Sequence, residues 1–280
     1  MAHPDRFLLA GVMGWPVMHS RSPKLHNHWL AERGLAGTYV PLAIEPHKIG
    51  PALRALAPLG FAGCNLTIPH KQTALAHVQE IDAVAQRIGA SSCIVVRPDG
   101  SLLAANNDGY GFIEGIREAD PAWRADAGPI VVIGAGGGAR AVVYSLAERG
   151  AREIRVFNRT PDRAKALEQE FGGPIKALPW DQRREALADA AMVVNTTSQG
   201  MVGEPPLDLP LDGLPRSALV SDIVYIPRET PLLAAARLRG NRTVNGLGML
   251  LHQARPAWKA WFGIEPEVTP ELRALIEATL

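Results

Sequence analysis

Short apolar runs alternate with helical patterns along the chain, and this alternation predicts an α/β protein. Strands are predicted over Phe7–Gly14 and Thr38–Leu42, and over Gly63–Ile68, where apolar and polar residues alternate. Helices are predicted between them over Pro23–Arg33 and Pro46–Ala57. This strand and helix order indicates parallel strands, because parallel neighbours need a crossover connection that is usually a helix.

The pattern changes after residue 80. Glu80–Ile88 predicts a helix, whereas the short strands Cys93–Val96 and Leu102–Ala105 flank Pro98-Asp99-Gly100 and predict a hairpin. A hairpin added to parallel strands makes a mixed sheet. A helix is predicted next, over Tyr110–Glu118.

A second α/β unit is predicted after the polar linker Asp120–Gly128, which contains proline and glycine. Its expected strands are Pro129–Ile133, Glu153–Phe157, Met192–Asn195 and Leu219–Ile226, and its expected helices are Ala141–Arg149, Asp162–Phe171, Pro231–Arg239 and Leu250–Phe262. The proline-rich loop between residues 199 and 216 is long, and long loops in compact domains are commonly functional or mobile.

A glycine cluster joins the first strand of this unit to its helix. The cluster is Gly134-Ala135-Gly136-Gly137-Gly138-Ala139. Glycines at 134 and 136 permit a sharp turn and a close approach of the backbone to a pyrophosphate, and small Ala139 lets helix and strand pack closely. The phosphates would lie at a helix N-terminus, where the unpaired N–H groups and the dipole favour anions. The strand-to-helix context favours a dinucleotide site over an ordinary glycine-rich loop.

The next strand ends in Asn158-Arg159-Thr160, close to where such folds select their cofactor. NAD sites usually place an acidic residue there for the ribose 2′-hydroxyl, whereas arginine suits a 2′-phosphate. Arg159 and Arg163 therefore favour NADP. The alternative is that both are solvated arginines at a helix start.

Composition limits the class of partner. The chain has 29 basic and 28 acidic residues, a net charge of +1, so no overall field attracts nucleic acid or an anionic membrane, and we expect a small-molecule partner. Cys64 and Cys93 are too few for a disulfide framework and lack zinc spacing. The polar Met1–Arg6 and the absence of a long apolar run argue against a signal peptide or membrane span, so we expect a cytoplasmic protein. No interface pattern is distinct from the core pattern, so both a monomer and a homodimer remain expected.

Polar residues near helix starts and strand ends are candidate ligands. Ser22-Pro23 is a good N-cap and N1 pair, so capping is the favoured role of Ser22, although Ser20 and Ser22 could instead hold a substrate carboxylate. Asn65, Thr67 and Lys71 follow a predicted strand, the usual position of substrate groups in α/β folds. Asp108 could be functional or simply a helix N-cap. His19, His26 and His28 have no recognised metal spacing, and no metal is expected.

Eight spaced motifs together resemble the shikimate dehydrogenase family over nearly the whole chain. They are His19–Pro23 (H-S-x-S-P), Asn65–Lys71 (N-x-T-x-P-x-K), Asn106–Gly109 (N-T-D-G with one change), Gly134–Gly138 (G-A-G-G-A with Gly138 as the change), Asn158–Thr160 (N-R-T), Asn195–Ser198 (N-T/A-T-S), Asp222–Pro227 (D-x-x-Y-x-P) and Gly246–Leu250 (G-x-G-M-L). Their agreement in order makes chance similarity negligible.

The resemblance implies a two-domain α/β fold and a reaction. A mixed-sheet substrate domain would comprise residues 1–107 and 247–280, with the C-terminal helices returning to it, and a Rossmann-type NADP domain would comprise residues 108–246. The implied activity is the reversible NADPH-dependent reduction of 3-dehydroshikimate to shikimate, a step of aromatic amino acid and chorismate biosynthesis.

The resemblance also implies roles for individual residues. Lys71 would donate the proton and Asp108 would orient it. The implied substrate ligands are Ser20, Ser22, Thr67 and Tyr225 for the carboxylate, Asn65, Lys71, Asp108 and Gln253 for the hydroxyls, and Ser92 at a ligand position. The implied cofactor ligands are Gly134, Ala135, Gly136, Gly137, Gly138, Ala139, Asn158, Arg159, Thr160, Arg163, Thr196, Thr197, Ser198, Val224, Gly246 and Met249.

Three departures from the family motifs bear on the substrate. Ser92 replaces a substrate-binding Asn, Asn107 replaces Thr, and Asn245 replaces a frequent Asp. Serine is shorter and lacks the paired donor and acceptor of an amide. A paralogue acting on quinate or a related hydroxylated ring acid is therefore an alternative. A catalytically idle NADP-binding sensor is a third, although the retained Lys71 and Asp108 argue against it.

Overall fold

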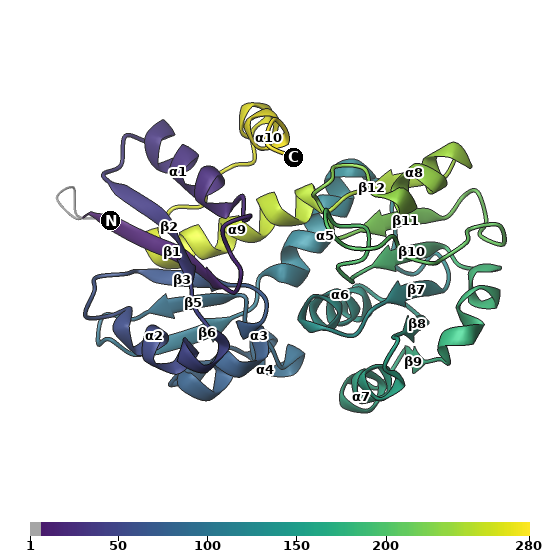
Figure 1. The fold of residues 1–280 in the computed structure, drawn as a ribbon, viewed down its shortest axis with the longest axis horizontal. Helices are drawn as coiled ribbons and strands as arrows, with labels where there is room; N and C mark the ends of the chain where they lie inside the picture. The colour runs from purple at the N-terminus through teal and green to yellow at the C-terminus, as the bar shows by residue number, and fades with distance from the viewer. Residues whose placement is uncertain (1–6) are drawn as a thin grey trace. The chain divides into compact units, whose positions relative to one another are not determined.

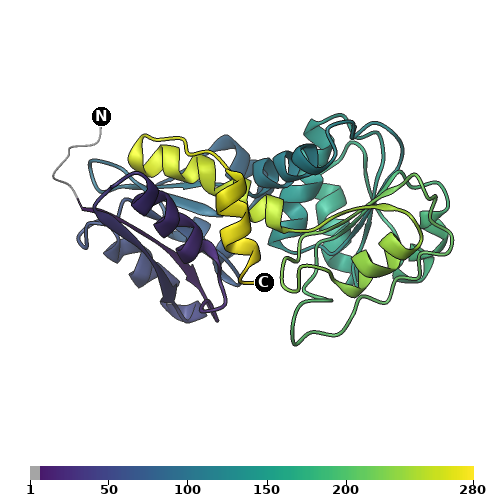
Figure 2. The ribbon, with the colours of Figure 1, turned by 90° about the horizontal axis from the view of Figure 1, so that it is seen from above.

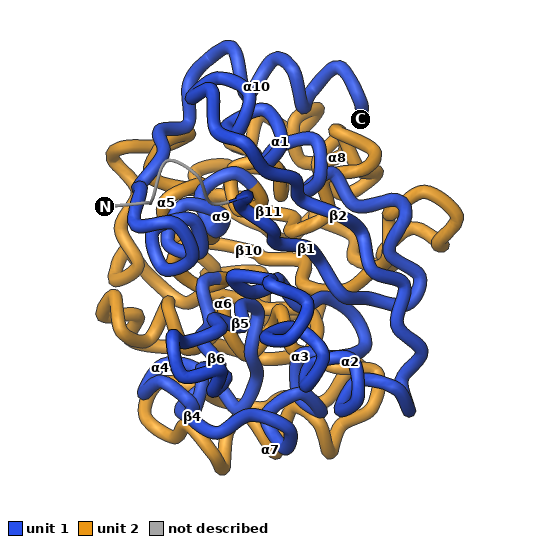
Figure 3. The backbone as a smooth tube through the Cα atoms, turned by 90° about the vertical axis from the view of Figure 1, so that its left-hand side faces the viewer, with its two compact units in different colours: residues 1–107, 251–279 blue, residues 108–250, 280 orange. Residues whose placement is uncertain are grey.

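The chain folds into two compact units, each built on its own sheet (Figure 1; Figure 3). The computed structural model describes residues 7–280, so the polar N-terminal stretch Met1–Arg6 lies outside the described residues. The first unit runs to Asn107 and resumes with Leu251–Thr279, and the second is Asp108–Leu250. The chain therefore leaves the first unit once and returns to it within a single helix, α9 (Leu247–Phe262).

The first unit contains a six-stranded mixed sheet in the order β2-β1-β3-β5-β6-β4. Its strands are β1 (Leu8–Gly14), β2 (Gly37–Ala43), β3 (Gly63–Leu66), β4 (Glu80–Ile81), β5 (Cys93–Val96) and β6 (Leu102–Ala105). Strand β1 is parallel to β2 and β3, whereas β5 is antiparallel to both β3 and β6. The predicted hairpin and mixed sheet are confirmed.

The helices of this unit are mostly short. They are α1 (Ser22–Glu32), α2 (Ile49–Ala55), α3 (His70–Thr73), α4 (Ala83–Ile88), most of α9 (Leu247–Phe262) and α10 (Pro270–Glu277), with the 3₁₀ turns η1 (Pro46–Lys48) and η2 (Ala74–His77). Helix α10 packs against α1, and Figure 2 shows this yellow helix beside the purple one. Trp261 of α9 donates a hydrogen bond to the Ile94 carbonyl of β5 at 2.8 Å. The predicted return of the C-terminal helices is thus confirmed.

The helix predicted over Glu80–Ile88 is wrong at its start. Its first two residues form β4, which is parallel to β6, and α4 begins only at Ala83. Asp82 sets that start, because its carboxylate accepts the Ala85 N–H at 2.6 Å as an N-cap. Gly89 ends the helix with φ +70°, a conformation that glycine adopts at little cost.

The second unit contains a fully parallel six-stranded sheet in the order β12-β11-β10-β7-β8-β9. Its strands are β7 (Ile130–Ile133), β8 (Ile154–Phe157), β9 (Ile175–Ala177), β10 (Met192–Asn195), β11 (Leu219–Asp222) and β12 (Arg242–Val244), and its helices are α5 (Asp108–Ala119), α6 (Gly137–Glu148), α7 (Pro161–Phe171), α8 (Pro231–Leu238) and the start of α9, with η3 (Trp180–Arg183) and η4 (Glu185–Leu187). In chain order this is 6-5-4-1-2-3, the Rossmann arrangement, so the predicted fold class is confirmed.

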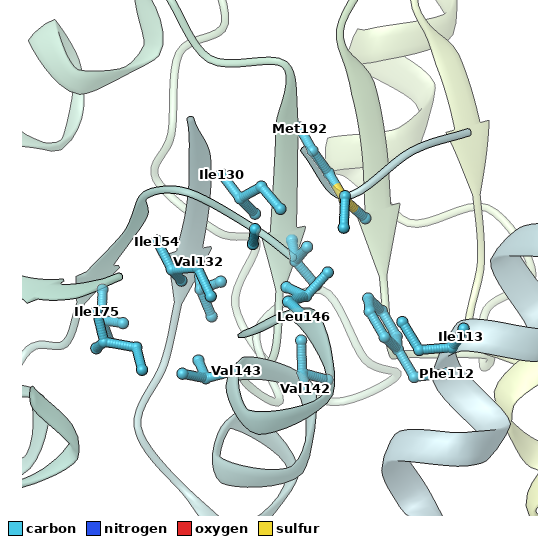
Figure 4. Packing of buried hydrophobic residues seen from close by; sticks show 14 of the residues in the cluster. Phe112, Ile113, Ile130, Val132, Val142, Val143, Leu146, Ile154, Ile175 and Met192 are labelled. Carbon is cyan, nitrogen blue, oxygen red and sulfur yellow. The ribbon is translucent and has the colours of Figure 1, made fainter. Parts of the chain in front are cut away.

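Both faces of this parallel sheet are covered, which is why its central strand β7 is continuously apolar. Ile130 and Val132 belong to a cluster with residues of α5, α6 and α7, whereas Val131 and Ile133 belong to another with residues of α8. Figure 4 shows the first cluster, with Phe112, Ile113, Val142, Val143 and Leu146 contributed by α5 and α6. Helices α5 and α6 can approach closely because Gly109 has no side chain. A Cβ at this position would overlap the Ser145 hydroxyl.

The strand predicted over Leu219–Ile226 is wrong at its end, because β11 ends at Asp222. The Asp222 carboxylate accepts the N–H of Val224, and this hydrogen bond turns the chain out of the sheet. Among the described residues, no helix is both long and apolar enough to cross a membrane.

Candidate functional site

The glycine loop connects β7 to α6 with room for a ligand at the helix start. Gly134 has φ +116°, and a Cβ there would overlap the Thr196 hydroxyl, so only glycine fits. A Cβ at Gly136 would meet nothing within 4 Å, and Gly136 is the N-cap of α6 without a side-chain capping bond. Ala139 is fully buried. The loop therefore leaves an uncapped helix N-terminus facing open space, as anion binding requires.

The loop after β10 adjoins the glycine loop. Thr196 bonds to the Ile133 carbonyl through both its N–H (2.8 Å) and its hydroxyl (2.7 Å). Asn195 shapes this loop by accepting the N–H (3.0 Å) and the hydroxyl (2.7 Å) of Thr197. Ser198 follows and is exposed. Strands β7 and β10 are neighbours at the point where the strand order reverses, which is where open α/β sheets bind their ligands.

Asp222 links three segments at the carboxyl end of this sheet. Its carboxylate accepts hydrogen bonds from the Asn195 amide (3.0 Å), the Val224 N–H (3.0 Å) and the Thr230 hydroxyl (2.8 Å). The side chain is fully buried, and burial raises the pKa of Asp222 while these hydrogen bonds oppose the increase. Sequence reasoning identified Asp222 only as the first letter of a motif and missed this organising role.

A small groove lies beside these loops in the same unit. It is lined by Ile223, Gly246, Met249 and Phe112 among others. Gly246 donates its N–H to the Val224 carbonyl at 3.0 Å, and its Cβ position is filled by the backbone of Ile223. The predicted cofactor residues Val224, Gly246 and Met249 therefore lie together.

The turn after β8 and the start of α7 carry two exposed, positively charged side chains. Asn158 shapes the turn by donating to the Thr160 carbonyl at 2.8 Å, and Arg159 and Arg163 are exposed. Within residues 7–280, neither of these guanidinium groups forms an ion pair or a hydrogen bond. Because Phe157 pairs with Ile133, this turn follows the strand next to the glycine loop. An uncapped helix start and two uncommitted arginines fit the pyrophosphate and the 2′-phosphate of NADP.

In the first unit, the structure overturns the expected capping role of Ser22. Arg21 occupies the N-cap position of α1, and no side chain caps the helix there. Instead the Ser20 hydroxyl accepts the N–H of Ser22 at 3.2 Å, and the Ser22 side chain lies beside the Tyr39 phenol. Arg21 is held by Thr279, whose carbonyl oxygen accepts from Nε at 3.0 Å and from Nη2 at 2.7 Å. Both serines are therefore presented by an anchored loop.

The segment after β3 carries three predicted ligands in fixed positions. Thr67 donates its N–H to the Met13 carbonyl at 2.9 Å and accepts the N–H of His70 at 2.9 Å. His70 is buried with Nε2 2.8 Å from the Ile44 carbonyl, and burial lowers the pKa of this ring. These bonds fix α3, and therefore the backbone of Lys71, which accepts the N–H of a neighbouring loop residue, Ser91, at 2.7 Å.

Ser92 and Asn65 share this region of the first unit. The Ser92 hydroxyl accepts the N–H of Asn107 at 2.8 Å, and its carbonyl accepts the Asn65 amide at 3.1 Å. Two departures from the family motifs, Ser92 and Asn107, are thus in direct contact. Gln253 lies on α9 in the same unit.

The remaining predicted substrate residues belong to the second unit. Asp108 is fully buried in the first turn of α5, and Tyr225 lies in the loop after β11. The structure therefore brings Ser20, Ser22, Asn65, Thr67, Lys71, Ser92 and Gln253 into one unit and places Asp108 and Tyr225 with the nucleotide loops in the other.

Family models match both units. The model of the shikimate dehydrogenase substrate binding domain matches residues 12–94, and the model named shikimate / quinate 5-dehydrogenase matches residues 122–202. Curated relatives match nearly end to end. The NADP(+) shikimate dehydrogenase of Rhodospirillum rubrum is 55% identical over 96% of both chains, and that of Paramagnetospirillum magneticum is 51% identical over 96% of this chain and 97% of its own.

Solved structures give the same result. A Thermus thermophilus shikimate 5-dehydrogenase in complex with NADP(H) and shikimate is 35% identical, with a TM-score of 0.87 over 98% of this chain and 100% of its own. A quinate dehydrogenase from Corynebacterium glutamicum in complex with NAD is 31% identical, with a TM-score of 0.89 over 97% of this chain and 99% of its own.

Proposed function

Because this chain belongs to the shikimate dehydrogenase family, we propose that it catalyses the reversible NADPH-dependent reduction of 3-dehydroshikimate to shikimate. The observation that carries the proposal is identity of about half or more, over nearly the full length, to relatives named NADP-linked shikimate dehydrogenases. The activity belongs to aromatic amino acid and chorismate biosynthesis.

We propose that NADP binds the second unit at the carboxyl end of its sheet. The pyrophosphate would bind the glycine loop at the start of α6, and Arg159 with Arg163 would pair with the 2′-phosphate. The other proposed contacts are Ala135, Gly137, Gly138, Ala139, Asn158, Thr160, Thr196, Thr197, Ser198, Val224, Gly246 and Met249. When bound, NADPH supplies the hydride for the carbonyl carbon of the substrate.

The substrate ligands are proposed mainly from the first unit. Ser20, Ser22 and Thr67 would donate hydrogen bonds to the ring carboxylate, and Tyr225 would add a donor from the second unit. Asn65, Lys71, Ser92, Asp108 and Gln253 would bind the ring hydroxyls. The anchored serine loop and the fixed segment after β3 support this assignment, because both present their side chains without backbone freedom.

Lys71 is the proposed proton donor. Negative charge develops on the carbonyl oxygen as hydride arrives, and the Lys71 ammonium would stabilise that charge and release its proton to the oxygen. Asp108 would orient the ammonium group. A lysine on the short helix α3 suits this role. The hydrogen bonds of His70 and Thr67 fix the helix, and the long lysine side chain can extend from it to the substrate.

Ser92 favours quinate, or a related ring acid, as the second candidate substrate. The serine hydroxyl already accepts the Asn107 N–H, so it keeps its own hydrogen and one lone pair for a ring hydroxyl, both on a single atom. The curated relatives from Rhodospirillum rubrum and Paramagnetospirillum magneticum are named shikimate dehydrogenases, which favours shikimate. We further propose a cytoplasmic monomer or homodimer, and a reducing compartment agrees with the absence of a disulfide between Cys64 and Cys93.

Steady-state assays of the purified protein with shikimate and quinate, each with NADP and NAD, test the proposal. We expect the highest kcat/KM for shikimate with NADP. A higher kcat/KM for quinate would replace the proposed substrate. NADP binding without turnover of any ring acid would instead indicate the idle sensor.

A further inference from the structure

Tyr39 of β2 adjoins two of the proposed substrate ligands. It is 2% exposed, its hydroxyl donates to Oδ1 of Asn65 at 2.8 Å, and the Ser22 side chain lies beside its phenol. We propose that Tyr39 is a positioning residue for the ring-acid substrate, whose buried hydroxyl fixes the Asn65 amide so that one N–H of that amide is left for a substrate hydroxyl. The inference rests on the proposed function.

The hydrogen bonds of Asn65 fix which way its amide faces. The carbonyl oxygen accepts from Tyr39, and Nδ2 donates one hydrogen to the Ser92 carbonyl at 3.1 Å. Rotating the amide by half a turn would place its oxygen against the Ser92 carbonyl, so two acceptors would face each other. The second hydrogen on Nδ2 is the donor that we assign to the substrate.

The direction of the Tyr39 bond is also fixed. Burial raises the pKa of Tyr39 well above its ordinary value, so the phenol keeps its hydrogen. The phenol therefore donates its single hydrogen to Asn65. The Ser22 side chain lies beside the same phenol, so a proposed carboxylate ligand and a proposed hydroxyl ligand both adjoin Tyr39.

The Tyr39 ring cannot move away from this position. His26 stacks on it with centroids 4.0 Å apart and planes 3° from parallel. The Asn27 side chain forms two hydrogen bonds with the Tyr39 backbone. Its Oδ1 accepts the Tyr39 N–H at 2.8 Å, and its amide donates to the Tyr39 carbonyl at 2.9 Å. A hydroxyl held so firmly pre-organises the amide that it bonds.

The expected kinetic effect of Tyr39 is on substrate binding. Its hydroxyl donates to Asn65, a proposed ligand of a substrate hydroxyl rather than the proposed proton donor. Losing it would free the Asn65 amide to rotate in the Michaelis complex and in the transition state alike. Loss of such uniform binding raises KM and leaves kcat nearly unchanged.

The Tyr39→Phe variant of the full chain tests this. Phenylalanine keeps the ring stacked on His26, so we expect a folded protein with a melting temperature close to that of the parent. KM for shikimate should rise about 3- to 10-fold, the range of one hydrogen bond. The value of kcat should change less than twofold, and KM for NADP should not change. Tyr144→Phe is the control. It removes a tyrosine hydroxyl from α6 of the second unit and should leave KM for shikimate unchanged.

A double-mutant cycle tests the route through Asn65. In an Asn65→Ala background, adding Tyr39→Phe should raise KM for shikimate by less than twofold, because the amide that Tyr39 positions is gone. An unchanged KM in Tyr39→Phe, or an undiminished effect in the Asn65→Ala background, would overturn the inference. Failure of the proposed function has a different result, namely no turnover of shikimate by the parent protein. Calorimetric shikimate binding to the parent and to Tyr39→Phe would then test the positioning role directly, and equal dissociation constants would overturn it.

Discussion

Nδ1 of His26 accepts a hydrogen bond from the indole N–H of Trp258 at 2.7 Å, in the core of the first unit. Indole is only a donor, so this nitrogen carries no hydrogen and the ring is neutral. Burial lowers the pKa of His26 from its ordinary 6.5 to about 3. A proton on Nδ1 would break the bond to Trp258 and leave a buried charge.

The His26–Trp258 bond predicts loss of stability in mild acid. Below pH 6.5 the unfolded chain binds a proton that the folded ring rejects until about pH 3, so the free energy of unfolding falls as the pH falls through this window. The slope from this group is about 1.4 kcal/mol per pH unit. We expect His26→Asn to remove this contribution, because Oδ1 of asparagine can accept from Trp258 without titrating.

Urea unfolding at pH 7.5 and pH 5.0 measures the effect. The parent should be more stable than His26→Asn at pH 7.5, and the difference should narrow by about 2 kcal/mol at pH 5.0. Gln86→Asn, at an exposed position of α4 that does not titrate, is the control, and its difference from the parent should stay constant. A constant difference for His26→Asn would contradict the prediction.

Arg159 should set the preference for NADP. Its exposed guanidinium has no partner among the described residues, so replacing it disturbs no bond within residues 7–280. Arg159→Ala should lower kcat/KM for NADP about 10- to 100-fold, as expected for one charge-assisted hydrogen bond of roughly 1.5 to 3 kcal/mol, and should barely change kcat/KM for NAD. Arg152→Ala, another exposed arginine of the second unit, is the control. Equal losses with both cofactors would remove Arg159 from the 2′-phosphate site.

Lys71 should affect turnover more than binding. A proton donor acts mostly in the transition state, so Lys71→Ala should lower kcat by about 10²- to 10⁴-fold and change KM for shikimate much less. Lys24→Ala, an exposed lysine of α1, should leave kcat unchanged. If Asp108 orients the ammonium group, adding Asp108→Asn to Lys71→Ala should lower kcat little further. An undiminished kcat in Lys71→Ala would assign proton transfer to another group.

Sequence patterns predicted best the elements that are buried, because buried elements appear in the sequence as apolar runs. Strand β10 was predicted at its observed limits because Met192–Val194 is apolar and the whole strand is buried between two neighbours. Strands β4, β9 and β12 are two or three residues long and carry no detectable period, so they were missed. Their pairing partners are distant in sequence, and only the assembled sheet defines them.

The candidate site shows the same limit. Motif spacing identified Asn65 and Ser22 as candidate ligands, because they lie at a strand end and a helix start. It could not reveal that Tyr39 hydrogen-bonds to Asn65, because an aromatic residue in a strand is ordinarily a core residue and its partner is 26 positions away. Ser22 also resembled a cap because Ser-Pro is the usual sequence there, but Arg21 occupies the N-cap position and no side chain caps the helix.

Ser92 should weaken the use of shikimate relative to an asparagine at the same position. Its hydroxyl accepts the Asn107 N–H at 2.8 Å, so the side chain keeps one hydrogen for a ring hydroxyl and no second polar atom. In Ser92→Asn, Oδ1 can keep the bond to Asn107 while the amide N–H₂ reaches the substrate. We expect kcat/KM for shikimate to rise about 5- to 100-fold, since a half-paired hydroxyl costs about 1 to 3 kcal/mol.

Two outcomes bound this prediction. Ser92 is 4% exposed, so a water that bridges Ser92 and the substrate would be enclosed. Such a water binds nearly as well as a direct hydrogen-bond partner, and it would reduce the gain in kcat/KM of Ser92→Asn toward nothing. Ser91→Asn is the matched control, because the Ser91 hydroxyl donates to the backbone carbonyls of Cys93 and Ala105, both at 3.0 Å, and its replacement should bring no gain. If Ser92→Asn instead lowers kcat/KM for shikimate, and the parent uses quinate or another ring acid better, then Ser92 is tuned to that acid and shikimate is not the substrate.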